Sequence, residues 1–332
     1  MTDITERVAD PSAVWRIIHG FSAYFVTVAA VHLGIFDLVA AEPLDAQRLA
    51  SACGADPARL TTLCDALVAL ELLVRDHDAY TSTPASQMFL VTGAPRSMRE
   101  LLLRSPGPWE NWPALDATVR GATSPRPVGA EFHERLVRAT FPTQFAAASR
   151  TAEMVGPVAY VLDLGAGGAP WTISLLHANP QAHAVVNDLA PVIEVARENV
   201  AQQGLTERCE FREGDYFAIS LPDAAFDAVV LGHVLRAEGL DGAQQLLRRA
   251  VDALRPGGLV VVADYFVDDD RRGPLNALLL GVTMMASTPA GSTYTYGEFK
   301  SLLAAAGAER VEVLRPVPFQ EVMIGRKAGG RT

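Results

Sequence analysis

The residues whose types and spacing could do chemistry begin with a glycine-rich run near the middle of the 332-residue chain. In residues 161–169 an apolar stretch leads through Asp163, Gly165 and Gly167. A strand that turns through glycines lets backbone N–H groups approach a ligand closely, and the start of a following helix favours negative charge. The spacing fits a dinucleotide fingerprint as well as it fits the loop of enzymes that bind S-adenosyl-L-methionine (SAM). Alone it therefore predicts only a nucleotide-like ligand.

Two acidic residues downstream narrow the class of ligand that this loop could bind. Asp188 closes the next apolar stretch, where a carboxylate can accept both hydroxyl protons of a ribose. Asp215 follows the third stretch and could accept a proton from an adenine amino group, while the rings of Tyr216 and Phe217 could flank the base. The simpler interpretations, a solvated acid at a strand end and a polar turn over core aromatics, stay open. Together the residues predict a site for a cofactor that contains adenosine.

The residues that could act in catalysis are His233 and Arg236, in the segment 231–238. A histidine with an ordinary pKa near ~6.5 can accept a proton around neutrality. An arginine stays protonated and cannot act as a general base, but it can steady an anion. A structural histidine at a strand end and a surface ion pair of Arg236 with Glu238 are the alternatives.

The elements that must position these residues alternate between strand and helix from about residue 160. Single helices between strands predict an α/β fold with a doubly wound, mostly parallel sheet. We expect the strands at 159–164, 184–188, 209–213, 228–231 and 259–264, with a final pair near 310–314 and 321–326.

The N-terminal part has a different pattern. Apolar residues recur at three- and four-residue spacing over residues 12–90, which predicts mostly helix. Short helices start near Leu44 and Asp56, and residues 72–82 form a hairpin, an order that resembles a winged helix. Arg59 is the only basic residue of the second short helix, which favours an interaction module over a DNA-binding one.

The order of the motifs carries a family resemblance. The second half resembles class I SAM-dependent methyltransferases in Asp163-x-Gly165-x-Gly167, Asp188, Gly214-Asp215 and the turn Arg255-Pro256-Gly257-Gly258. With the helical first part and the run Thr295-Tyr296-Gly297-Glu298-Phe299, the chain is similar to small-molecule O-methyltransferases with an N-terminal dimerisation domain. The resemblance implies a winged-helix-like dimerisation domain over 1–100, a connector over 101–150 that contributes to the acceptor pocket, and a SAM-binding catalytic domain over 151–332.

The resemblance also implies roles for single residues. Asp163, Gly165 and Gly167 would shape the cofactor loop and Asp188 would hold the ribose, while Asp215 with Tyr216 or Phe217 would hold the adenine. One departure is that Ala169 stands where the family has the last glycine of the loop.

A second departure concerns the base. Such O-methyltransferases carry a histidine that removes the acceptor's proton, and Arg236 stands in its place, with His233 about one turn earlier. The family's supporting acid is replaced by Thr293. Three hypotheses follow: His233 is the base; no base is needed and Arg236 steadies an acceptor anion; or the SAM site serves other chemistry, such as cyclisation, hydroxylation or decarboxylation of a natural-product scaffold.

The acceptor pocket is expected where the helical part meets the sheet. The residues that we expect to line it are Trp109, Trp112, Met284, Met285 and Tyr296, with Phe132, His133, Phe141 and Phe145 as further candidates. For each one the alternative is a place in the core, where such side chains more often lie.

Charge and composition bound the partners. The balance of 28 Lys+Arg against 38 Asp+Glu gives a net charge of -10, so we expect no nucleic-acid partner. The 3 cysteines lack metal-ligand spacing and the acids at 268–270 lack a converging partner, so we expect no metal. Hydrophobic residues at 49% indicate extensive buried surface, some of it between the subunits of a homodimer.

Targeting signals and membrane segments are not indicated. Residues 1–11 lack the basic start of a signal peptide, which predicts a cytoplasmic protein. The apolar stretch 21–40 is interrupted by polar residues and a glycine, so we expect a buried helix and no membrane association. The sequence thus predicts a SAM-dependent methyltransferase of a small aromatic or polycyclic natural-product intermediate, at oxygen or carbon. A ligand-responsive binding module, with a SAM domain as sensor, is the alternative outside enzymes.

Overall fold

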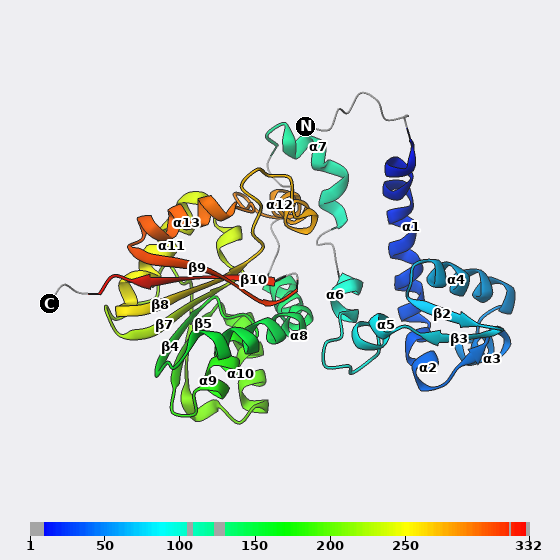
Figure 1. Ribbon diagram of the computed structural model, residues 1–332, viewed down its shortest axis with the longest axis horizontal. Helices are drawn as coiled ribbons and strands as arrows, with labels where there is room; N and C mark the ends of the chain where they lie inside the picture. Colours follow the sequence, from blue (N-terminus) through cyan, green and yellow to red (C-terminus); the bar gives the residue numbers. More distant parts are fainter. Residues whose placement is uncertain (1–9, 105–108, 123–129, 319, 330–332) are drawn as a thin grey trace. The chain divides into compact units, whose positions relative to one another are not determined.

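The computed structural model of the chain describes residues 10–104, 109–122, 130–318 and 320–329 (Figure 1). The chain divides into two compact units, Met1–Leu103 and Arg104–Thr332. Each unit has its own hydrophobic core.

The N-terminal unit is helical and carries a small antiparallel sheet in the order β1-β3-β2. Its elements are α1 Ser12–His32, α2 Ile35–Ala41, β1 Leu44–Asp45, α3 Ala46–Cys53, α4 Pro57–Ala69, β2 Leu73–Asp76, β3 Ala79–Ser82, α5 Pro84–Phe89 and, across the unit boundary, α6 Arg99–Arg104. Helices α3 and α4 start where Asp45 and Asp56 accept the backbone N–H three residues on. Two short helices followed by the β2–β3 hairpin confirm the predicted winged-helix-like order.

Helices α1 and α2 correct part of one expectation. We expected a buried helix over 21–40; this stretch forms the end of α1 and all of α2, and it is buried at Thr27, Ala30, Val31, Ile35, Phe36 and Val39 but exposed at its start. The first half of α1 leaves large apolar side chains exposed, with Ile17 at 78% and Phe21 at 66%. By length and composition alone, α1 passes as a candidate membrane span, the one helix of the described residues that does. Helical periodicity shows which face is apolar, and it does not show what covers that face.

The C-terminal unit is built on a seven-stranded sheet in the order β6-β5-β4-β7-β8-β10-β9. The strands are β4 Tyr160–Leu164, β5 His183–Asp188, β6 Cys209–Glu213, β7 Phe226–Gly232, β8 Leu254–Asp264, β9 Ala308–Val317 and β10 Gln320–Lys327. The helices are η2 Trp109–Ala114, α7 Leu115–Val119, α8 Ala130–Val155, α9 Pro170–Ala178, α10 Ala190–Gln202, η3 Thr206–Arg208, η4 Leu235–Ala237, α11 Gly239–Ala253, α12 Leu275–Ser287 and α13 Tyr296–Ala305.

Both faces of this sheet are covered. Helices α8, α9 and α10 contribute to one core cluster, and α11 and α13 contribute to the other (Figure 1). Along β4, Val161 packs into the first cluster and Leu162 into the second, and both are fully buried. Strands buried on both faces read as continuous apolar runs, which explains why the sequence predicted them. The last parallel strand starts earlier than expected, at Leu254, because the Arg255–Gly258 turn forms its irregular beginning.

The parallel strands bring the candidate residues together at the carboxyl ends of the strands. Strands β6, β5, β4, β7 and β8 all run in the same direction, and β10 is antiparallel to β8. Strand order reverses between β4 and β7, and ligands of open α/β sheets bind outside the carboxyl ends of the strands at such a point. The glycine run follows β4, Asp188 ends β5, and His233 follows β7.

Candidate active site

The loop after β4 has the backbone that its glycines predict. Gly165 and Gly167 adopt left-handed φ values of 67° and 59°. A Cβ built on Gly165 would lie 2.5 Å from Cγ1 of Val234 and 3.4 Å from the ring of Tyr216. Only a residue without a side chain therefore lets Val234, the neighbour of His233, pack against the loop. Ala169 also has a left-handed φ of 59°, so the residue that departs from the family keeps a glycine-like backbone.

Asp163 lies beneath this loop. It is fully buried, and its Oδ2 accepts a hydrogen bond of 2.7 Å from the hydroxyl of Thr172 on α9. Its Oδ1 has no hydrogen-bond partner among the described residues. Burial raises the pKa of Asp163 to about 7, and the bonds from Thr172 oppose that rise. The carboxyl group ties β4 to α9 below the loop.

Asp188 fastens the loop to the next strand. Its Oδ2 accepts the N–H of Gly167 at 2.8 Å, and its Oδ1 accepts the N–H of Leu189 at 2.7 Å. Burial raises the pKa of Asp188, while these two donors lower it. Each carboxylate oxygen has a second lone pair, so Asp188 can still accept hydroxyl protons from a ribose.

The predicted adenine residues gather beside the same loop. Asp215 is exposed, and its Oδ1 accepts the N–H of Phe217 at 2.8 Å. The ring of Tyr216 lies against Gly165, and its hydroxyl donates to Glu238 at 2.5 Å. Burial and Glu238 raise the pKa of Tyr216. An exposed acid next to aromatic rings fits an adenine, with Tyr216 nearer to the glycine loop.

Asn187 is a site residue that sequence reasoning missed. It is fully buried, and its amide donates to the carbonyls of Arg212 and Gly214, each at 2.8 Å. These bonds lock the turn after β6 to the end of β5. A polar residue just before Asp188 at the end of an apolar strand was the available signal.

His233 is enclosed. Its side chain is 4% exposed, and neither ring nitrogen has a hydrogen-bond partner among the described residues. Its backbone adopts a left-handed φ of 65°, and its N–H donates to Ala263 at 2.8 Å. Burial and, second, the charge of Arg236 hold the pKa of His233 well below its usual range. The imidazole is therefore neutral at physiological pH.

Arg236 is paired, but with a different residue from the one expected. Its Nη1 donates to Oδ1 of Asp264 at 3.0 Å, whereas Glu238 binds Tyr216. Nδ1 of His233 lies 3.9 Å from the same Asp264 oxygen. The guanidinium also lies 6.0 Å from the centre of the Tyr265 ring.

Asp264, which ends β8, was missed by the sequence analysis. It is 2% exposed, and its Oδ2 has no hydrogen-bond partner among the described residues. Its nearness to Arg236 depends on the pairing of β7 with β8, where Gly232 lies opposite Ala263.

The predicted acceptor residues are only partly brought together. Helix η2 touches α12 through a hydrogen bond of 2.9 Å from Asn111 to the carbonyl of Ala286, which places half-buried Trp112 near the segment of Met284 and Met285. A Cβ built on Gly291 would meet both Met284 and the carbonyl of Arg236, so Met284 lies close to the segment that holds the candidate catalytic residues. The side chain of Trp109 lies outside the described residues.

Tyr296, the first residue of α13, lies near the carboxyl end of β8. It lines a cavity of about 560 Å³ together with Asp264 and Glu321, and its hydroxyl contacts the Glu321 carboxylate. No group of three metal-ligating side chains occurs among the residues that the structure describes.

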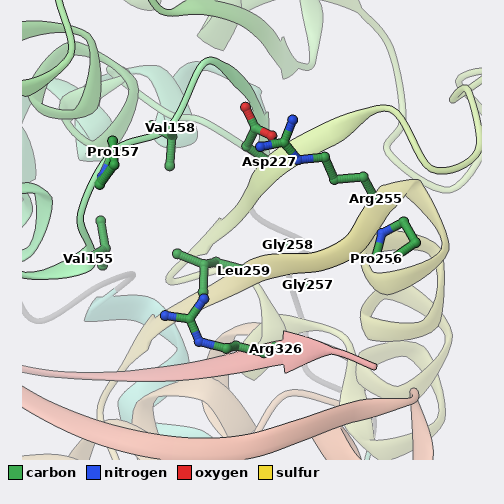
Figure 2. Close-up of a pocket in the computed structure, with 10 residues that line it drawn as sticks. All are labelled: Val155, Pro157, Val158, Asp227, Arg255, Pro256, Gly257, Gly258, Leu259 and Arg326. Atoms are coloured by element: carbon green, nitrogen blue, oxygen red, sulfur yellow. The ribbon is translucent and has the colours of Figure 1, made fainter. Parts of the chain in front are cut away.

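A second cavity, of about 290 Å³, lies at the amino ends of β7 and β8, away from the carboxyl ends that hold the candidate residues (Figure 2). Asp227 at the start of β7 and Arg255 at the start of β8 line it and form an ion pair, with Arg326 across the cavity. The Arg-Pro-Gly-Gly turn therefore lies away from the cofactor loop and belongs to the sheet.

Comparisons with known proteins identify the family of both parts of the chain. The family model of the O-methyltransferase domain matches residues 143–309, and that of the O-methyltransferase dimerisation domain matches residues 15–92. Mouse acetylserotonin O-methyltransferase is 32% identical, over 97% of this chain and 89% of its own length. The 3-hydroxy-5-methyl-1-naphthoate 3-O-methyltransferase of Streptomyces sahachiroi is 29% identical over 86% of each chain.

A solved structure gives the same fold. Human N-acetylserotonin methyltransferase, solved in complex with SAM, superposes with a TM-score of 0.82 at 24% identity, over 98% of this chain and 99% of its own. The chain belongs to the O-methyltransferase family, as the motif order indicated, and is a SAM-dependent methyltransferase that carries a dimerisation domain.

Proposed function

We propose that the enzyme transfers the methyl group of SAM to a hydroxyl oxygen of a small aromatic or polycyclic natural-product acceptor. The observation that carries the proposal is the contact between Val234 and the glycine loop, which supports a site in which the segment of His233 and Arg236 adjoins the proposed cofactor residues. The names of the relatives support the acceptor class, since they specify acetylserotonin and a hydroxynaphthoate.

The cofactor residues fit this reaction. Asp188 would hold the ribose hydroxyls through its free lone pairs, Asp215 the adenine amino group, and the ring of Tyr216 one face of the base. Bound SAM supplies a methyl group on a sulfonium, which an acceptor must approach in line with the bond that breaks. Asp163 acts below the loop, so its role is to fix the loop and not to touch the cofactor.

Proton removal is where this chain departs from its family. His233 would have to become an imidazolium in a buried place, beside the positive charge of Arg236, so it is a weak base. Arg236 keeps donors besides the one that binds Asp264, and its charge favours the anionic form of an acceptor hydroxyl. We infer that the acceptor hydroxyl loses its proton to solvent water before methyl transfer, and that Arg236 steadies the resulting anion.

The first test is the reaction itself. Enzyme, SAM and a panel of phenols and hydroxynaphthoates are incubated, and S-adenosylhomocysteine (SAH) and methylated product are measured. Equal amounts of SAH and O-methylated product are expected. C-methylated product would correct the acceptor atom, and conversion of the acceptor without SAH would contradict methyl transfer on that acceptor.

The second test separates the two candidate catalytic residues. Arg236→Gln should raise the acceptor KM by about tenfold or more, because a hydrogen bond to a charged group is lost. Arg236→Lys should retain part of the affinity for the acceptor, because lysine keeps the positive charge. His233→Ala should lower kcat less than tenfold, with the Kd for SAH unchanged in all three variants. A fall of about 100-fold in kcat for His233→Ala would show instead that it is the base.

We further propose that the enzyme is a cytoplasmic homodimer that binds neither nucleic acid nor membranes. The dimerisation-domain match begins at residue 15 and so includes most of α1, whose apolar face is exposed. The net charge of -10 makes binding to the negatively charged backbone of a nucleic acid unfavourable.

A further inference from the structure

One face of α8 lies along the cofactor loop. A Cβ built on Gly167 would lie 3.3 Å from Cγ1 of Val137, and one built on Gly168 would lie 3.0 Å from the ring of Phe141. Residues four apart share a face of a helix, so Val137 and Phe141 define the face of α8 that covers the loop. The ion pair of Arg138 with Glu198 holds the same helix to α10.

His133 is the next residue on this face, one turn before Val137. Val137 lies against Gly167, whose N–H donates to Asp188, and Phe141 lies against Gly168, so His133 continues this face of α8 beyond Gly167. The charges of His133 and Asp188 act on each other: burial lowers the pKa of His133, and Asp188 raises it. The sequence analysis had placed His133 with the acceptor, and the structure places it on the cofactor side.

The imidazole of His133 is available for a ligand. The described residues give it no hydrogen-bond partner; its ring makes an edge contact with Phe132, with centroids 5.9 Å apart. Neighbouring atoms cover part of the His133 side chain and leave the rest exposed, so a bound molecule can reach it. Burial keeps its pKa low, which favours the neutral ring with one N–H donor and one acceptor nitrogen.

We propose that His133 is a further cofactor-binding residue, which donates a hydrogen bond to a ribose hydroxyl of the cofactor opposite Asp188. A ribose hydroxyl is both donor and acceptor, and Asp188 can only accept. The N–H of His133 supplies the donor that Asp188 lacks. This inference rests on the proposed role of Asp188 at the ribose.

The test uses SAH and its 2′-deoxy and 3′-deoxy analogues, with affinity measured by calorimetry on the intact enzyme. His133→Ala should weaken SAH binding about 3- to 10-fold, as expected for the loss of one neutral hydrogen bond. The analogue that lacks the contacted hydroxyl should bind wild type and variant equally. His133→Gln keeps an N–H donor and should recover part of the affinity. Arg135→Ala is the matched control, because Arg135 pairs with Glu131 on the exposed side of α8 and should leave affinity unchanged.

Unchanged SAH affinity in His133→Ala would overturn the inference. So would an equal loss for SAH and both deoxy analogues, since that pattern reports a displaced helix and not a lost ribose contact. Asp188→Asn separates this inference from the proposal on which it rests. If Asp188→Asn binds SAH like wild type, the assignment of Asp188 fails; if it binds weakly while His133→Ala binds normally, only the role of His133 fails.

Discussion

At the scale of single residues, Asp163 makes the stability of the fold depend on pH. Burial raises its pKa to about 7, from 3.8 when the group is free, so the native state keeps a proton that the unfolded chain releases. Stability is therefore unaffected below about pH 4, falls as pH rises between the two pKa values, and levels off above pH 7. Asp163→Asn stays neutral throughout and still offers an oxygen to the hydroxyl of Thr172.

Asp163→Asn should consequently melt a few degrees above wild type at pH 8, and at about the same temperature at pH 4. Thermal unfolding of both proteins at pH 4, 6 and 8 gives the comparison, since all other groups titrate alike in the two proteins. Melting temperatures that stay parallel across this range would show that the carboxyl group is ionised in the native state.

The same scale shows why the surroundings of the candidate catalytic residues were harder to predict than those of the candidate cofactor residues. Gly165, Gly167 and Asp188 depend on local backbone needs and strand ends, both of which a sequence reveals. The partner of Arg236 does not follow from local sequence. Asp264 comes 28 positions later and meets Arg236 only because β7 and β8 pair in one particular register. Glu238, the nearer acid in sequence, binds Tyr216 instead.

At the scale of elements, the loop after β4 depends on Gly165 for two separate reasons. Its φ of 67° strains any side chain, and a Cβ would lie 2.5 Å from Val234. Gly204 has a φ of 69° with nothing within 4 Å of a built Cβ. A side chain at Gly204 would therefore strain the backbone but would not clash with a neighbour.

Gly165→Ala should thus be destabilised beyond the ~1 kcal/mol of backbone strain that Gly204→Ala suffers, and SAH affinity should fall as Val234 is pushed from the loop. Denaturant unfolding and SAH calorimetry on both variants test this. If the two variants lose equal stability and Gly165→Ala binds SAH normally, the packing of Val234 on the loop does not matter.

Elements also show where sequence patterns are ambiguous. The strands of the parallel sheet were predictable because burial on both faces makes them mostly apolar, as at Val161 and Leu162. Helix α1 also has an apolar pattern, yet its first half is exposed. A helix that faces its own core and one that faces another chain obey the same periodicity.

At the scale of the whole molecule, the exposed half of α1 is the surface through which we propose that two copies of the chain associate. Trp15, Ile17 and Phe21 are 53%, 78% and 66% exposed, and all lie within the dimerisation-domain match. Clustered large apolar side chains of this kind mark protein or membrane contacts in soluble proteins. A family match to a dimerisation domain favours a second copy of the chain as the occupant.

Phe21→Glu should convert the dimer to a monomer at micromolar concentration, because a carboxylate buried in an apolar interface without a partner costs several kcal/mol. Light scattering after size exclusion measures the mass. Met154→Glu is the control, since Met154 is 51% exposed on α8 and should leave the mass of the dimer unchanged. Sedimentation with neutral phosphatidylcholine vesicles tests the alternative that the apolar face of α1 binds lipid. A wild-type protein that is monomeric and sediments with the vesicles would show that the apolar face of α1 meets lipid and not a second subunit.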